Sequence, residues 1–205
     1  MSLVKVKVNM KRLRDRIRRP NRRLREIARK KAEVRFKKAK QQMVENFESH
    51  PVTQEIRSGP DAGNASSTLG GYGNLYSYIG FSSSAGDPTA IVSHALKNST
   101  KLERMPSSVR RMKSTIEYKF KVGLVDMSIL ETMTPMPWEN GRSWLRGIER
   151  GISGFGAYMY GKGGGRSGSA FQTQTQIRSG GFRNVKYMSE ILKKFVKDLK
   201  RKRGA

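Results

Sequence analysis

Residues 115–125 read TIEYKFKVGLV, and this stretch decides the fold class. Every even-numbered position from Ile116 to Leu124 is apolar or aromatic, whereas the odd-numbered positions from Glu117 to Gly123 carry charge or no side chain. A period of two is that of a β-strand with one face on a core and the other toward water or a neighbour. The sequence therefore predicts a strand here.

A second strand is predicted at the N-terminus, inside a basic arm that spans residues 1–19. Valines at positions 4, 6 and 8 alternate with lysines at positions 5 and 7, which gives the strand one basic face. Such a face suits the edge of a sheet, where charged side chains are common.

A long helix is predicted over residues 20–48, because Pro20 suits a first turn and Pro51 stops the run. Its large apolar residues form a stripe that changes phase near the middle, which indicates two packing partners. The stripe comprises Leu24, Ile27, Val34, Phe36, Met43 and Phe47.

Further helices follow from capping and periodicity. Asp87 and Pro88 suit the start of a short helix carrying Ile91, Val92 and Leu96, and residues 143–150 support another. The last helix, over about residues 185–202 within a C-terminal segment 185–205, is strongly amphipathic and leads into a basic tail. Its apolar positions are Met188, Ile191, Leu192, Phe195, Val196 and Leu199.

The remaining segments read as loops and one more strand. Residues 58–73 and 161–168 are rich in glycine and small polar residues, which is typical of long flexible loops. Residues 74–81 are predicted as a strand with Leu75, Ile79 and Phe81 on one face and Tyr76 and Tyr78 on the other. We expect an α+β fold in a single elaborated domain over residues 1–205.

Positive charge is concentrated at the two ends of the chain. The chain has 42 Lys and Arg against 16 Asp and Glu, a formal charge of +26. Residues 1–48 and 151–205 together contribute 23 of these net charges, and residues 49–100 are almost neutral. Segregated charge attracts polyanions, so nucleic acid, or a protein that holds it, is the first expected partner.

The candidate contacts to such a partner are basic residues of the two terminal helices. A merely solvated helix face is the alternative, although the few acidic neighbours leave the charges to repel one another. The candidates are Arg22, Arg23, Arg25, Arg29, Lys30, Arg35, Lys200, Arg201 and Arg203.

The sequence offers no catalytic, cofactor or metal site. It has no cysteine, and its two histidines, His50 and His94, cannot form a zinc site alone. The segment 156–163 imitates a phosphate-binding loop but ends in glycine where magnesium needs a hydroxyl. Glu131 and Glu139 are too isolated to propose as an acid/base pair. We therefore expect a protein that is not an enzyme, and the lack of a long apolar run predicts no membrane span or signal peptide.

Two stretches carry a resemblance to a known family. A long basic helix ends in Phe47-Glu48-Ser49-His50-Pro51-Val52-Thr53, and Gly73-Asn74-Leu75-Tyr76-Ser77-Tyr78-Ile79 follows after a loop. This arrangement resembles the tail-completion, or neck, proteins at the head–tail junction of tailed bacteriophages, in which a lysine-rich helix leads to a proline and then to a Gly-x-Leu strand start.

The resemblance implies a structural virion protein with no membrane partner. Its long helix would pack on an antiparallel sheet, and copies, six or twelve of them, would form a ring around the channel through which DNA passes. Adjoining connector and tail proteins would be further partners, in the virion and in the host cytoplasm during assembly. Candidate contacts between subunits are Tyr76, Tyr78, Trp138 and Trp144.

A basic nucleic-acid-binding protein of the ribosome- or nucleoid-associated type is the main alternative. A pI near 10.8 and a Gly-rich loop are equally natural there. However, the sequence lacks zinc-finger spacing, an aromatic RNA-binding signature and a clear helix-turn-helix. Stoichiometry separates the two classes, because a junction protein forms a ring and a binding factor is a monomer or dimer.

Overall fold

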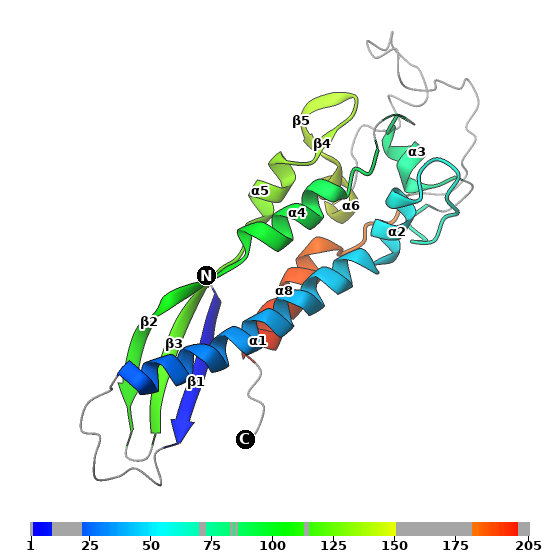
Figure 1. The fold of residues 1–205 in the computed structure, drawn as a ribbon. Coiled ribbons are helices and arrows are strands. Elements are labelled where there is room, and N and C mark those ends of the chain that lie inside the picture. The colour runs from blue at the N-terminus through cyan, green and yellow to red at the C-terminus, as the bar shows by residue number, and fades with distance from the viewer. Residues whose placement is uncertain are drawn as a thin grey trace, which may run out of the picture. The chain divides into compact units, whose positions relative to one another are not determined.

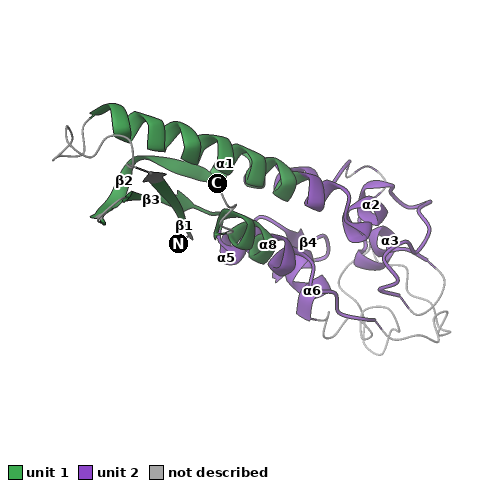
Figure 2. Cartoon of the chain, turned by 90° about the horizontal axis from the view of Figure 1, so that it is seen from below, with its two compact units in different colours: residues 1–44, 96–125, 192–205 green, residues 45–95, 126–191 purple. Residues whose placement is uncertain are grey.

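The structure is a computed structural model with two compact units (Figure 2). Unit 1 takes its residues from 1–44, 96–125 and 192–205, and unit 2 from 45–95 and 126–191. The expected single domain stays a prediction. The structure describes residues 2–9, 22–69, 73–82, 84, 86–112, 115–150 and 182–200.

Unit 1 contains an antiparallel sheet of three strands in the order β1-β3-β2. The strands are β1 (Ser2–Asn9), β2 (Lys101–Arg111) and β3 (Thr115–Gly123). The predictions of a strand from Thr115 and of an N-terminal edge strand are confirmed. The core face of β3 follows the period-two pattern, since Ile116, Tyr118, Phe120 and Val122 are all buried.

Strand β2 was not predicted, and its sequence explains why. Pro106 interrupts it, and the register with β3 shifts on both sides of this residue. Proline lacks the N–H that a central strand needs, so it is confined to edge strands and bulges. Because β2 is an outer strand with mostly exposed side chains, it shows no alternation to detect.

Helix α1 (Arg22–Glu48) lies across one face of this sheet through its unit 1 residues (Figures 1 and 2). The predicted end at Glu48 is confirmed, whereas Pro20 lies outside the described residues. The predicted phase change is wrong, because Ile27 and Val34 are 38% and 69% exposed. Alanines continue the stripe at steps of three or four residues instead, and their small side chains let the helix approach its neighbours closely. The buried residues of α1 are Leu24, Ala28, Ala32, Phe36, Ala39, Met43 and Phe47.

Helix α8 (Met188–Lys200) contributes residues to both units, and its unit 1 part, residues 192–200, packs against α1. The rings of Phe36 and Phe195 meet edge to face with centroids 6.4 Å apart, and Arg35 donates a hydrogen bond to the carbonyl of Asp198 at 3.4 Å. The prediction of an amphipathic C-terminal helix is confirmed, although it begins three residues later than expected. Residues 201–205, which include the predicted basic tail, lie outside the described residues.

Unit 2 contains short elements. It holds α2 (Pro51–Arg57), α5 (Met127–Thr132), a hairpin of β4 (Pro135–Met136) and β5 (Glu139–Ser143), and α6 (Trp144–Arg150). The predicted helix over 143–150 is confirmed as α6. Helix α4 (Ala90–Ser99), which contributes residues to both units, begins two residues after the predicted first turn at Pro88.

The predicted strand over residues 74–81 is wrong, because helix α3 (Leu75–Ile79) forms there. The side chain of Asn74 caps it by accepting a hydrogen bond from the Ser77 N–H at 2.9 Å. Gly80 ends it with φ of +89°, a left-handed conformation that glycine adopts without strain. Two capping residues therefore override the strand propensity of the tyrosines between them.

The loop that follows α2 is held in place by one buried carboxylate. Glu55 of α2 is 1% exposed and accepts hydrogen bonds from the backbone N–H groups of Ser66 and Leu75, each at 2.7 Å. The side chain of Asn74 also donates to the carbonyls of Pro60 and Ala62. The described part of the predicted loop thus has no regular strand or helix but has fixed anchor points. The second predicted loop, 161–168, lies outside the described residues.

Tyr187 fills the centre of unit 2. Its side chain is fully buried, its ring stacks on Phe47 with centroids 5.9 Å apart, and its hydroxyl bonds with that of Thr53. Burial raises the pKa of the Tyr187 phenol, so the hydroxyl stays protonated. His50 lies over the same ring and caps α2 through Nδ1; burial lowers the pKa of His50, which favours the neutral form that accepts this bond.

Candidate functional site

The first candidate site is the outer surface of α1, which we call the α1 basic face. It consists of exposed residues on the side of the helix opposite the buried stripe. They are Arg22, Arg23, Arg29, Lys30, Lys31, Lys37 and Lys38.

The α1 basic face is only slightly neutralised by its own helix. Arg22 pairs with Glu26 at 3.1 Å and Arg29 with Glu33 at 2.8 Å, both one helical turn apart. Exposed pairs of this kind contribute about 0.3–0.5 kcal/mol each. Residues 22–40 contain ten basic side chains and only these two acidic ones, so the face keeps a large positive charge.

The structure separates the predicted contact residues into three groups. Arg22, Arg23, Arg29, Lys30 and Lys200 are exposed, and Arg201 and Arg203 lie outside the described residues. The other two are half-buried: Arg35 bonds to α8, and the Nε atom of Arg25 is buried without a hydrogen-bond partner in the described part of the chain. Five of the nine are therefore placed where a partner could reach them.

Lys40 shows where the basic surface ends along α1. Its Nζ donates to the carbonyl of Thr100 at 3.0 Å and lies 5.8 Å from the centre of the Phe36 ring. Burial, and then the nearby charge of Lys101, lower the pKa of Lys40. This lysine links α1 to the backbone at Thr100 within unit 1 and is not part of the α1 basic face.

The four aromatic residues predicted to contact other subunits have partners inside unit 2. Tyr76 and Trp144 are buried; the Tyr76 hydroxyl donates to the carbonyl of Ser82. Trp138 donates to the carbonyl of Ile79 at 2.7 Å, and Tyr78 stacks on Phe182 at 5.6 Å. Only Tyr78 and Trp138 keep surface that a neighbour could touch, and the contact between subunits stays a prediction.

The second candidate site is an open cleft in unit 2 that the sequence analysis missed. It has a volume of about 1060 Å³ and lies between the β4–β5 hairpin, α5, α6 and the residues Phe182 and Asn184. We call it the arginine cleft, because three of its lining residues are Arg142, Arg146 and Arg150. The spacing of four residues between these arginines was the available signal.

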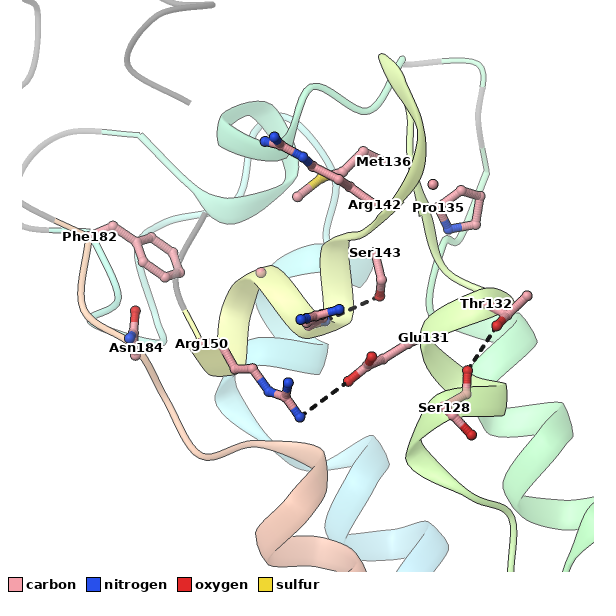
Figure 3. A pocket seen from close by; sticks show the side chains of 13 residues that line it. Ser128, Glu131, Thr132, Pro135, Met136, Arg142, Ser143, Arg150, Phe182 and Asn184 are labelled. Atoms are coloured by element: carbon pink, nitrogen blue, oxygen red, sulfur yellow. Dashed lines mark hydrogen bonds and ion pairs between the residues drawn. The ribbon is translucent and has the colours of Figure 1, made fainter. Parts of the chain in front are cut away.

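Figure 3 shows the side chains that line the arginine cleft and the elements that carry them. Arg150 of α6 faces Glu131 of α5, with 3.9 Å between the guanidinium and the carboxylate. Ser143 is fixed in the floor, since its hydroxyl bonds with that of Thr134 and accepts from the backbone N–H of Arg146. The other side chains that line the cleft are those of Ser128, Thr132, Pro135, Met136, Phe182 and Asn184.

The chemistry available in the cleft is anion binding. Three arginines and one glutamate line it, and guanidinium forks bind carboxylate or phosphate with two parallel hydrogen bonds. Across the described residues, no group of three or more His, Asp or Glu side chains could hold a metal ion, and no helix is long and apolar enough to cross a membrane.

Comparison with known proteins found no relative of this chain. The chain matches no protein-family model, no curated protein and no solved structure.

Proposed function

We propose that this protein is a structural subunit of the head–tail junction of a tailed bacteriophage. Copies form a ring around the DNA channel as a tail-completion or neck component, without a catalytic role. The observation that carries the proposal is the build of unit 1: a long helix lies on a small antiparallel sheet and turns a strongly basic face outward.

The sheet of unit 1 also has the edges that a ring subunit needs. Among the described residues, β1 and β2 each pair on one side only, with β3 between them. An unpaired strand edge can take a strand from a neighbouring subunit, and repeated head-to-tail contacts close into a ring. Met105 and Val109 on β2 are 58% and 40% exposed, which adds apolar surface along that edge.

The family resemblance supports the proposal in part. Of the features that the resemblance implies, the chain has the long basic helix that ends before Pro51 and lies on an antiparallel sheet. It lacks the expected strand start at Gly73 and Leu75, because helix α3 begins at Leu75. The proposal therefore rests on unit 1 more than on the motif in unit 2.

In this role the α1 basic face meets either DNA in the channel or acidic surfaces of adjoining proteins. Each phosphate that a protein neutralises adds salt-dependent affinity. A channel that must release DNA quickly should not hold many phosphates tightly. We therefore assign part of this charge to the adjoining connector and tail proteins.

The same basic face also favours a second function, that of a nucleic-acid-binding protein of ribosome- or nucleoid-associated type. Such a protein would bind DNA or RNA with strong salt dependence as a monomer or dimer. A ring that persists without nucleic acid separates the two proposals.

Charge reversal on α1 tests the proposed role of its basic face. We expect Arg23→Glu, Lys30→Glu and Lys37→Glu together to lower incorporation into phage particles at least about tenfold, equivalent to about 1.4 kcal/mol of lost contact. These residues are exposed and stand seven apart on one helix. The changes at Lys30 and Lys37 each put an acidic residue four positions after Glu26 or Glu33, and such like-charge pairs cost about 0.2–0.5 kcal/mol each, so helix stability is measured alongside incorporation.

The control reverses equal charge in another place, at Arg183, Lys186 and Lys193, which are also exposed. Incorporation is scored by quantitative blotting of purified particles after confirming that both variants melt at the wild-type temperature. Unchanged incorporation of the α1 variant, or an equal loss in both variants, would refute a role for the α1 basic face.

A further inference from the structure

We propose that the arginine cleft of unit 2 binds an acidic, extended segment of a different protein. The inference deepens the proposed function, on which it rests for the source of that protein, an adjoining component of the junction. The binding itself can be measured on the isolated protein.

The first argument is the charge of the cleft. Three arginines line the cleft against one carboxylate, that of Glu131, which lies 3.9 Å from the Arg150 guanidinium. Arg146 is exposed and the Arg150 side chain is 64% exposed, so both can reach a ligand. The cleft therefore keeps a net positive charge, and its residues can bind carboxylates through guanidinium forks.

The second argument is spacing. Arg146 and Arg150 stand one helical turn apart on α6, which at 1.5 Å per residue is about 6 Å along the axis. Alternate residues of an extended chain lie about 6.6 Å apart and point to the same side. The pair Arg146 and Arg150 therefore matches two acidic residues that stand two positions apart in an extended peptide.

The third argument is the rest of the lining, which favours peptide over nucleic acid. Pro135 and Phe182 offer apolar surface to the intervening side chains of a peptide, and Ser128, Thr132 and Asn184 can bond to its backbone. Phe182 already stacks on Tyr78, so one face of its ring is covered. Glu131 can accept a hydrogen bond from a peptide N–H, a donor that a phosphate backbone lacks.

A second copy of this chain cannot be the occupant. Its 16 acidic residues never stand next to one another or two positions apart anywhere in the sequence. No segment of it therefore presents carboxylates at alternate positions, and its charge of +26 opposes self-association through a positive cleft. The complementary segment belongs to an acidic partner.

The test is a binding titration with a fluorescein-labelled peptide of twelve residues that alternates Glu with Leu or Ser. The probes for comparison are the same peptide with Gln in place of Glu and a single-stranded oligonucleotide of twelve nucleotides. We expect the Glu peptide to bind at least about tenfold more tightly than the Gln peptide. Anisotropy is recorded at two salt concentrations.

Variants locate the site. The double variant Arg146→Gln with Arg150→Gln should lower the affinity for the Glu peptide at least about tenfold. The double variant Arg146→Lys with Arg150→Lys should lower it about threefold to fivefold, because lysine keeps the charge but lacks the guanidinium fork. Arg23→Gln with Lys30→Gln removes the same charge from the α1 basic face and should change the affinity less than about twofold. All variants are first checked for unchanged melting temperature.

Two results would overturn the inference. One is an equal affinity of the Glu peptide for the cleft variant and the α1 variant, which would show that the overall charge of the protein, and not the cleft, determines binding. The other is an oligonucleotide whose affinity depends on Arg146 and Arg150 while the peptide's does not, which would make the cleft a nucleic-acid site. If the cleft binds the peptide but the protein forms no ring, this inference stands. That result would count only against the proposed role at the head–tail junction.

Discussion

Replacing Tyr187 by alanine is expected to lower the free energy of unfolding by about 3–5 kcal/mol, the range for deleting a large buried aromatic side chain. Tyr187 is fully buried and contacts both Phe47 and His50 through its ring. Removal of the ring leaves a cavity in unit 2 and leaves the Thr53 hydroxyl without its bonding partner. The effect is measured by denaturant unfolding followed by circular dichroism.

A conservative variant divides this effect into its parts. Tyr187→Phe keeps the ring and removes only the hydroxyl, so we expect a cost of about 1 kcal/mol. Thr53→Val combined with Tyr187→Phe should recover part of that cost, since neither hydroxyl is then left unpaired. A cost below about 1 kcal/mol for Tyr187→Ala would show that Tyr187 is not at the centre of this core.

Replacing Glu55 by glutamine is expected to cost about 2–4 kcal/mol, although the two side chains have the same shape. The carboxylate accepts two buried backbone N–H groups, from Ser66 and Leu75, and bonds to a charged acceptor contribute about 1.5–3 kcal/mol each. An amide offers one oxygen and turns an NH₂ group toward the other donor. The loop before α3 should then exchange its amide hydrogens faster than in the wild type.

Asp61→Asn is the matched control, because it removes an acid in the same loop where the side chain is exposed. We expect its effect on stability to stay within about 0.5 kcal/mol. Thermal unfolding and hydrogen exchange of both variants give the comparison. An equally small effect for Glu55→Gln would mean that the loop is not held by this carboxylate.

The periodic parts of the fold were predictable from sequence. Period-two alternation predicted β1 and β3. Pro20 and Pro51 predicted the limits of α1, and apolar spacing predicted α6, each to within a few residues. These elements each bury one face, so the sequence must show which residues are inside. The buried stripe on α1 differs from the predicted one because Ala28, Ala32 and Ala39 carry its continuity, and the large apolar residues alone do not show it.

The elements that were missed or misassigned depend on single residues or on distant partners. Helix α3 is five residues long, and its identity is set by the caps Asn74 and Gly80, not by the aromatic residues between them. Strand β2 has no buried face to create a pattern. The β4–β5 hairpin is too short to show any period.

The candidate sites divide in the same way. The α1 basic face could be predicted because it needs only one helix and its charges. The arginine cleft could not, because Glu131 of α5 and Phe182 near α8 join Arg146 and Arg150 only after folding. The predicted aromatic contacts between subunits stay a prediction, although Trp144 is buried within its own unit.

The mass of the purified protein in solution tests the central proposal, a ring-forming structural subunit, most directly. The protein is treated with nuclease, separated by size exclusion and measured by light scattering at low and high salt, with negative-stain images of the eluted species. The account predicts a salt-resistant ring of about six or twelve copies of the 23.2 kDa chain. A monomer that forms large species only when nucleic acid is added would contradict it and favour the nucleic-acid-binding alternative.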